Sequence, residues 1–233
     1  MASCYWNRQS NCAVLLDIVA GQIDSLAVYP PTLGAPVPVD TLDPTAALVL
    51  VDLQKGITAL PTALDPGVIV ERAARLVRAA HDAGRPVVRI RTAFSPDGGD
   101  VLRGRTDAPG PSVAQGSDFA DLDPRVPSEP GDIVVTKRGW DAFAGTELDL
   151  QLRRRGVRSV VLAGIATSIG VESTARTARE LGYEVVVAHD VVTDLVASAH
   201  ATSLEVILPR IARLETVDVL APLLDSAESG RAE

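Results

Sequence analysis

The stretch Val160–Ala175, with the sequence VVLAGIATSIGVESTA, decides the fold of this chain. Its first half is a continuous apolar run, which is typical of a strand buried on both faces of a parallel sheet. A turn rich in glycine, threonine and serine follows, and a helix is expected to open at about Ile169. A helix N-terminus presents unpaired N–H groups and a partial positive charge, which can lower a thiol pKa or stabilise an oxyanion. Gly170, the residue best placed to use them, has no side chain.

Strands and helices alternate on both sides of this stretch. A strand–helix–strand rhythm implies a parallel sheet with helices on both faces. We therefore predict a three-layer α/β/α fold with a mostly parallel, roughly six-stranded sheet of the Rossmann type. The expected strands are Ala46–Leu53, Pro86–Thr92, Asp132–Thr136, Arg158–Gly164, Glu184–Ala188 and a short one near Leu214, and the expected helices include Glu147–Arg155, Val171–Leu181 and Ala199–Leu208.

The first long helix has clear start and stop signals. Asp65 is the expected N-cap and Pro66 the first helical residue, and Gly84 follows the last turn. Apolar residues at helical spacing predict the face that packs inward. They are Val68, Ile69, Ala73, Leu76, Val77 and Ala80.

Composition narrows the class of protein. The chain has 233 residues and a formal net charge of −8, without a Lys/Arg-rich run, which argues against nucleic acid and anionic membranes as partners. Its two cysteines, Cys4 and Cys12, offer neither a disulfide framework nor metal-ligand spacing. The apolar segment Ala13–Ala20 is too short to span a bilayer and is a poor signal peptide. We expect a cytoplasmic protein that acts on a small molecule, as a homodimer or higher homo-oligomer.

Three segments are expected along the chain. Residues 1–43 form an N-terminal extension that ends in a proline-rich run, and no role is assigned to it. Residues 44–225 form the α/β domain, and residues 226–233 a tail. The long irregular stretch Ala93–Gly131 is rich in Gly, Pro, Asp and Ser, and loops of this length usually serve as functional covers or mobile segments.

Two charged residues follow apolar strands. Asp52 closes the first strand, where a carboxylate is destabilising unless it is paired or used. Lys137 follows the third strand. Ligands in such folds bind beyond the carboxyl ends of the strands, where both residues are expected to lie. Asp52 is either a general acid or base or a structural carboxylate, and Lys137 is either its partner or a solvated surface cation.

Three sequence islands, taken together and in order, carry a family resemblance. They are Leu50–Gln54 (LVDLQ), Thr136–Thr146 (TKRGWDAFAGT) and Ala163–Ala175. With them the chain resembles the isochorismatase-like (cysteine hydrolase) superfamily over roughly Ala46 to Leu220. The resemblance implies an isochorismatase-like hydrolase domain and a catalytic triad of Asp, Lys and Cys. That triad maps onto Asp52, Lys137 and Gly170.

The missing thiol changes the chemistry that the resemblance implies. Amide hydrolysis in this superfamily passes through a thioester on the cysteine, and Gly170 removes that step. True isochorismatases resemble this chain in carrying glycine there while they keep the Asp and Lys. We therefore expect a hydrolase that does not depend on cysteine, in which Asp52 protonates an electron-rich carbon and water adds. The substrate would be a vinyl ether of the isochorismate type.

Other residues are expected to contact the substrate. Trp140 and Phe143 could wall a pocket next to Lys137, although Phe143 suits the core equally well. In the resembling family, the peptide equivalent to Ala166–Thr167 is a non-proline cis bond that directs N–H groups at the reacting carbonyl. The full set of expected substrate contacts is Gln54, Phe94, Arg103 with Arg105 beside it, Trp140, Phe143, Ala166 and Thr167.

Alternatives stay open. The turn Gly164–Ser168 has the form of the amidase-like branch, and isochorismatases have a glutamine near the position of Phe94. The chain is then either an amidase relative that lost its cysteine and serves a biosynthetic pathway, or a binding pseudoenzyme. Ser168 is expected as a helix N-cap rather than a substitute nucleophile, and Ser173 and Thr174 as poorly directed ones. Because His81, His189 and His200 are scattered, we predict no metal and no cofactor.

Overall fold

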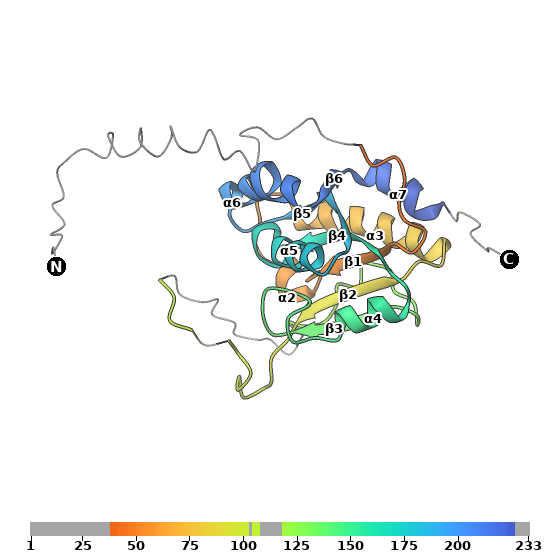
Figure 1. The fold of residues 1–233 in the computed structure, drawn as a ribbon. Coiled ribbons are helices and arrows are strands. Elements are labelled where there is room, and N and C mark those ends of the chain that lie inside the picture. The colour runs from red at the N-terminus through yellow and green to blue at the C-terminus, as the bar shows by residue number, and fades with distance from the viewer. Residues whose placement is uncertain (1–37, 103, 108–117, 227–233) are drawn as a thin grey trace, which may run out of the picture. The chain divides into compact units, whose positions relative to one another are not determined.

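The structure is a computed structural model that describes residues 38–102, 104–107 and 118–226 (Figure 1). Its centre is a six-stranded sheet with the strand order β3-β2-β1-β4-β5-β6, in which every neighbouring pair is parallel. This confirms the predicted α/β fold with a parallel sheet. The strands are β1 (Ala47–Val51), β2 (Val87–Thr92), β3 (Ile133–Lys137), β4 (Ser159–Ile165), β5 (Glu184–Thr193) and β6 (Arg213–Glu215).

The central strands β1 and β4 are buried along their whole length. Their residues are small, apolar or β-branched, as a strand covered on both faces requires. The strand β4 lies between β1 and β5 and runs parallel to both. The predicted strands Ala46–Leu53, Arg158–Gly164 and Glu184–Ala188 are therefore neighbours in one parallel sheet, as expected.

Two separate apolar clusters, one on each face of the sheet, give the molecule its three layers. Alternate residues of β1 point to opposite clusters, so that Leu48 and Leu50 lie in one while Val49 and Val51 lie in the other. The first cluster is closed by the helices α3 (Pro66–Asp82) and α7 (Val217–Asp225), and the second by α4 (Leu148–Arg154) and α5 (Glu172–Glu180).

The start of α3 agrees with the predicted cap. The Asp65 carboxylate accepts a hydrogen bond of 2.8 Å from the Gly67 N–H, Pro66 opens the helix, and Gly84 has a positive φ of 65°. The prediction that Val68 belongs to the inward face was wrong. Val68 is 40% exposed, because it lies in the first turn, one position before Ile69 in the buried stripe.

We expect Asp65→Ala to lower the free energy of unfolding by about 1 kcal/mol, because the cap satisfies an N–H group that the helix cannot bond. Asp82→Ala is the matched control, since Asp82 is the exposed last residue of the same helix, where a carboxylate faces the negative end of the helix dipole. Urea denaturation of both variants checks this. Equal losses in the two variants would contradict the capping role of Asp65.

Other elements differ in extent from the expected ones. The strand β5 runs on to Thr193, and the helix expected at Ala199–Leu208 is a composite. The remaining elements of the described chain are α2 (Lys55–Thr58), the π-helical turn η1 (Thr167–Val171), α6 (Ala197–Thr202), the π-helical turn η2 (Ser203–Ile207) and the 3₁₀ turn η3 (Leu208–Arg210). The helices α2 and α7 were not predicted. The stretch Ala93–Gly131 contains neither helix nor strand in its described parts.

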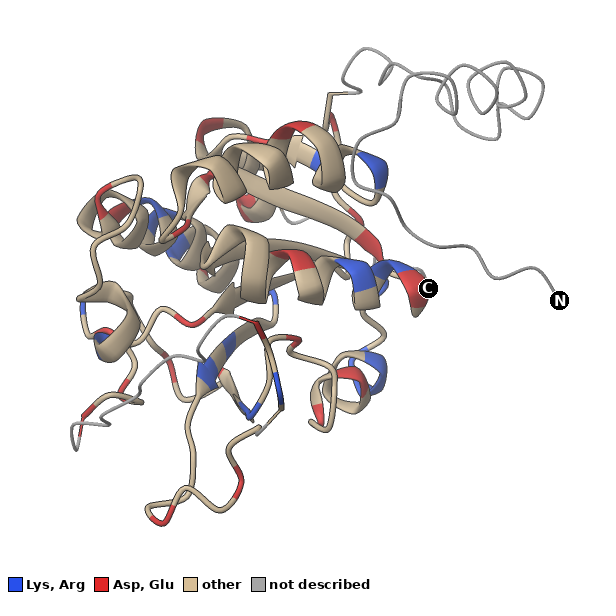
Figure 2. Ribbon diagram, turned by 90° about the vertical axis from the view of Figure 1, so that its left-hand side faces the viewer, with Lys and Arg blue, Asp and Glu red and all other residues tan. Residues whose placement is uncertain are grey.

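Charges of both signs are interspersed over the ribbon seen in Figure 2, where basic residues do not gather into one continuous stripe. Among the residues that the structure describes, no helix is long and apolar enough to cross a membrane.

Candidate active site

Three neighbouring strand ends bring Asp52 and Lys137 together. Asp52 follows β1, Thr92 ends β2 and Lys137 ends β3. The backbone N–H of Asp52 donates to Ile90 O at 3.1 Å, and Thr92 lies opposite Lys137 in the parallel register. The strand β2 therefore separates the two charged residues, and their side chains meet across its end.

The Asp52 and Lys137 side chains form a buried ion pair. Lys137 Nζ lies 2.8 Å from Asp52 Oδ2, and the two side chains are only 3% and 9% exposed, respectively. The Thr92 hydroxyl donates to Asp52 Oδ1 at 3.1 Å, while Lys137 Nζ also donates to Gly139 O at 3.0 Å. The expected approach of Asp52 to Lys137 is present, whereas the solvated position considered for Lys137 is wrong.

Burial dominates the acidity of Asp52. Removal of water raises the pKa of this carboxyl above its ordinary value, while the charge and hydrogen bond of Lys137 and the bonds from Thr92 act in the opposite direction. A carboxyl with a raised pKa retains its proton at a higher pH than an exposed one does. The site can therefore supply a proton and then stabilise the resulting carboxylate with the Lys137 ammonium.

Gly170 faces this pair. A Cβ atom built on Gly170 would lie 3.3 Å from Asp52 Oδ2, 3.7 Å from Lys137 Nζ and 2.8 Å from Val51 Cγ1. A side chain at this position would thus reach both charged groups at once. The third island places the turn beside the first two, as the resemblance implied.

The backbone at Asp52 has an unusual conformation. Its φ of 52° lies in the left-handed region, and Asp52 is the only described non-glycine residue with a positive φ. Such conformations cost free energy and occur most often at functional sites. The strand therefore turns sharply at the residue whose carboxylate meets Lys137.

The turn between β4 and α5 differs from the expectation in two details. The non-proline cis peptide joins Ile165 to Ala166, one residue before the expected Ala166–Thr167 bond. Ser168 is not a side-chain N-cap, because the helical turn η1 already begins at Thr167 and Ala166 precedes it. The Ser168 N–H donates instead to Asp194 Oδ2 at 2.7 Å, so the capping carboxylate comes from a distant segment.

Gln54 holds the loop beside the site. Its amide nitrogen donates to Thr92 O at 2.9 Å and to Phe119 O at 3.0 Å, while its oxygen accepts from the Thr92 N–H at 2.7 Å. Gln54 is fully buried, so these bonds account for a structural role between β2 and the loop that carries Phe119. All three bonds of its side chain go to backbone groups of the protein, whereas this side chain was expected from the sequence to contact the substrate.

Two aromatic candidates are separated by the fold. Trp140 is 62% exposed near the end of β3, whereas Phe143 is buried and packs on Tyr183 with ring centroids 5.9 Å apart. Phe143 therefore takes the core position, which was one of the two interpretations open for it. Leu102, which sequence reasoning missed, is 72% exposed and its Cδ1 would contact a Cβ on Gly139 at 3.3 Å. Leu102 therefore lies beside Gly139, close to the end of β3.

The other candidates lie as follows. Phe94 is half-buried just after β2, Arg105 is exposed, and Arg103 lies outside the described residues. Ala166 and Thr167 are buried in the turn beside Gly170. Neither of them projects freely into solvent.

Among the described residues, none of the hydroxyls considered as substitute nucleophiles donates a hydrogen bond to a carboxylate or an imidazole. The Thr174 hydroxyl accepts from the Ala142 N–H at 3.1 Å and is fully buried. Of the histidines, His81 bonds to Asp132 at 2.6 Å, and its side chain is mostly buried. His189 lies within β5, and His200 bonds to Thr167, a contact that sequence spacing could not indicate.

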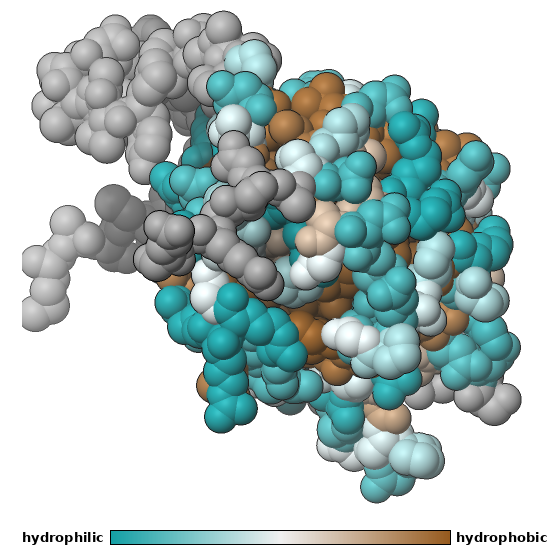
Figure 3. All heavy atoms as spheres, turned by 90° about the vertical axis from the view of Figure 1, so that its right-hand side faces the viewer, coloured by the Kyte–Doolittle hydropathy of each residue, from teal (hydrophilic) through white to brown (hydrophobic). Residues whose placement is uncertain are grey.

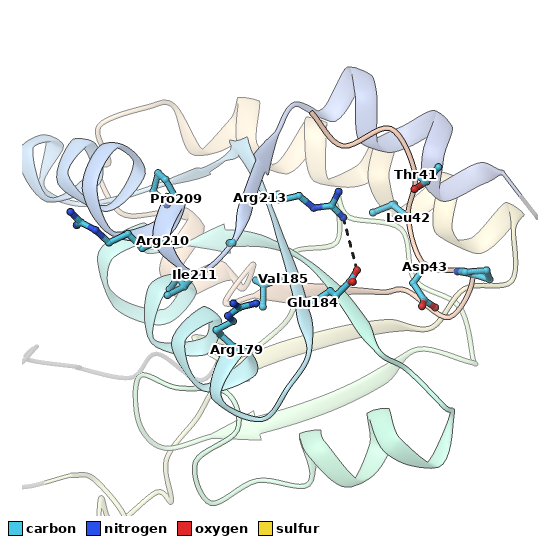
Figure 4. A pocket seen from close by; sticks show the side chains of 12 residues that line it. Thr41, Leu42, Asp43, Arg179, Glu184, Val185, Pro209, Arg210, Ile211 and Arg213 are labelled. Carbon is cyan, nitrogen blue, oxygen red and sulfur yellow. Dashed lines mark ion pairs between the residues drawn. The ribbon is translucent and has the colours of Figure 1, made fainter. Parts of the chain in front are cut away.

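A groove of about 690 Å³ lies at the opposite edge of the sheet, beside the first residues of β5 and β6 (Figure 4). Arg213 in this groove lies 4.0 Å from Glu184, and Arg210 donates to Val206 O and points away from Arg213. The arginines therefore do not converge on one point.

Figure 3 shows the side of the molecule on the right of Figure 1, where hydrophobic residues gather among hydrophilic ones.

The fold is an α/β protein with a parallel sheet, and it carries a buried Asp–Lys ion pair at the carboxyl edge of that sheet. Proteins of this fold class bind their ligands at that edge. The family model of the isochorismatase domain matches residues 46–219. The chain belongs to the isochorismatase family and is a hydrolase of that family.

Individual relatives agree with this assignment. The isochorismatase family protein YecD of Escherichia coli is 42% identical over 177 residues, which cover 75% of this chain and 93% of YecD. The structure of an isochorismatase family protein from Burkholderia thailandensis is 41% identical with a TM-score of 0.77, covering 80% of this chain and 98% of that one. The ureidoacrylate amidohydrolase RutB of Methylorubrum extorquens is 36% identical over 57% of this chain and 63% of its own length.

Proposed function

We propose that this hydrolase works without a nucleophilic cysteine and cleaves a small vinyl ether of the isochorismate type. The observation that carries the proposal is the buried Asp52–Lys137 pair, with its 2.8 Å contact, beside a glycine at the position where the superfamily has its thiol. Asp52 is the general acid, and Lys137 stabilises the carboxylate that remains after proton transfer.

The chemistry balances without a covalent intermediate on the protein. Protonated Asp52 transfers its proton to the terminal CH₂ carbon of an enolpyruvyl ether, which leaves an oxocarbenium ion. Water then adds to the cationic carbon that bears the ether oxygen and releases a proton, and the resulting hemiketal collapses to pyruvate and an alcohol. The Asp52 carboxylate regains a proton from the solvent or from the attacking water. The raised pKa of Asp52 favours the proton-loaded form that starts this sequence.

A second candidate is an amidase relative that lost its thiol and took up another reaction. The similarity to the ureidoacrylate amidohydrolase RutB and the turn sequence Gly164–Ser168 favour it. An amide leaving group is much poorer than the substituent of an activated ether, so amide cleavage without a nucleophile would be slow. A screen of small amides, carbamoyl compounds and enolpyruvyl ethers, followed by mass spectrometry, separates the two candidates from a binding protein without turnover.

Gly170→Cys tests how much of an ancestral thiol site remains. We expect the new thiol to react with iodoacetamide at lower pH than an ordinary thiol, whose pKa is about 8.5, because the Lys137 ammonium beside it favours the thiolate and Asp52 can accept its proton. The double variant Val51→Ala/Gly170→Cys relieves the 2.8 Å contact with Val51 Cγ1 and keeps the test valid if the single variant is unstable.

The alkylation rate is measured against pH, and Ser226→Cys at the exposed end of α7 serves as the control for an unperturbed thiol. If both thiols titrate alike and the substrate screen finds no turnover, the binding pseudoenzyme becomes the better account of this chain.

A further inference from the structure

The turn beside Gly170 is fastened by side chains from one later segment of the chain. The Asp194 carboxylate accepts from the Ser168 N–H at 2.7 Å and from the Val196 N–H at 3.1 Å. His200 Nδ1 lies 2.8 Å from the Thr167 hydroxyl oxygen. We name the segment Asp194–Ser203 the turn brace.

A third bond joins the brace to the helix that follows the turn. The Ser203 hydroxyl donates to Glu172 Oε2 at 2.6 Å, and Glu172 Oε1 accepts from Arg176. Both ends of this contact adjoin π-helical turns, η1 and η2, and such turns are frequent at functional sites. Side chains of a distant segment of the chain therefore help to fix the conformation of the turn.

We propose that His200 is a positioning residue that acts through Thr167 to hold the turn in the orientation that places Gly170 against the Asp52–Lys137 pair. This inference rests on the proposed function, since it assigns a role to a neighbour of the same site. Thr167 is fully buried, so its hydroxyl has no solvent to bond if His200 is removed. Removal of the imidazole would leave the Thr167 hydroxyl without this hydrogen bond, and we expect the turn to change conformation as a result.

Burial favours a neutral imidazole at His200 in the folded state. Burial lowers the pKa of His200 below its ordinary value, and the Asp194 carboxylate opposes this. Glu172, the charged group on the packed helix α5, is occupied by Arg176 and Ser203. A neutral ring has one nitrogen that accepts and one that donates, so Nδ1 either accepts a hydrogen bond from the Thr167 hydroxyl or donates one to it.

The test uses the thiol introduced by Gly170→Cys as a reporter of the turn. We expect His200→Phe in this background to raise the thiol pKa, with a three- to tenfold lower alkylation rate below the pKa, since each pKa unit changes the thiolate fraction about tenfold. His200→Asn should restore most of the rate, because the asparagine side chain carries a polar atom close to the position of Nδ1.

Thr202→Val is the matched control, because its hydroxyl bonds only to Ser198 O within α6. We expect no change in thiol reactivity there. Equal thiol pKa values in the His200→Phe, His200→Asn and unmodified reporter proteins would overturn the proposal, as would a reporter thiol that is ordinary from the start. The readout needs no turnover, so a failure here is distinct from a failure of the Asp52 mechanism.

A second readout follows from linkage. The lowered pKa of His200 means that the unfolded chain binds the proton more tightly, so stability that depends on neutral His200 is lost as the pH falls through the ordinary value of about 6.5. We expect the gap between the urea midpoints of wild type and His200→Asn to narrow between pH 7 and pH 5. A gap that is constant or widens would contradict a neutral, positioning imidazole.

Discussion

Replacement of Asp52 by Asn is expected to lower the turnover of an enolpyruvyl ether about 10²- to 10⁴-fold, because general acid catalysis contributes about that much to rate. The amide retains the volume and the hydrogen bond from Thr92 but has no proton to transfer. Pyruvate release, followed with a coupled dehydrogenase, measures the effect. The Asp52→Ala variant should lose turnover altogether.

The pH dependence gives the same prediction a second test. A general acid works in its protonated form, so the rate should fall as the pH rises through the pKa of Asp52, which burial shifts upward. The descending limb should therefore lie above the ordinary range of an aspartate, near 3.9, by an amount that Lys137 moderates. A rate that rises over this range instead indicates a general base.

Asp218→Asn is the matched control for the charge change. Asp218 pairs with Arg75 through an exposed bond of 2.7 Å on α7, among residues that the site does not use. We expect its turnover and pH profile to equal those of the wild type. Full turnover in Asp52→Asn would show that the proton comes from another group.

Gly164→Ala is expected to lower the free energy of unfolding by about 4 kcal/mol or more, which is a large part of the stability of an ordinary domain. A Cβ on Gly164 would lie 2.0 Å from Val51 O and 2.8 Å from Val51 N, and the φ of 127° is a region that side chains rarely adopt. The central strands β1 and β4 would have to separate. Poor soluble expression and a lower urea midpoint are the expected results.

Gly182→Ala separates the two causes. Gly182 also has a positive φ, of 87°, but nothing lies within 4 Å of its added Cβ. We expect it to lose only about 1–2 kcal/mol, the cost of a left-handed backbone for an alanine. If Gly164→Ala were no worse than Gly182→Ala, the close approach of β1 to β4 would be irrelevant to stability.

The fold followed from local patterns. The signals used were the continuous apolar runs, the Asp65–Pro66 helix start and the glycines after the helices. Each depends only on residues that are close in sequence, so it can be recognised without knowing any distant contact. The three islands, read in order, led to the correct family. The sequence pattern missed the helices α2 and α7, because α2 is a single turn of four residues and α7 contains Pro222, a residue that normally argues against a helix interior.

The site needed the tertiary structure. Asp52 and Lys137 meet because β2 lies between their strands and ends at the same level, a pairing that no local spacing encodes. The same holds for the bond of His200 to Thr167 and for the cap that Asp194 supplies to Ser168. Trp140 and Phe143 lie three residues apart, yet one is exposed and the other is in the core.

The sequence by itself determined which strands are buried on both faces, where the first long helix starts, and that residue 170, in the turn after the central strand, is a glycine. Only the tertiary structure decided which strand ends are neighbours, which side chains fasten the turn, and which aromatic residue is free to meet a ligand. The physical reason is the distance along the chain over which each interaction acts. Hydrophobic periodicity and capping act within a turn or a strand, whereas a buried ion pair depends on how the whole sheet is ordered.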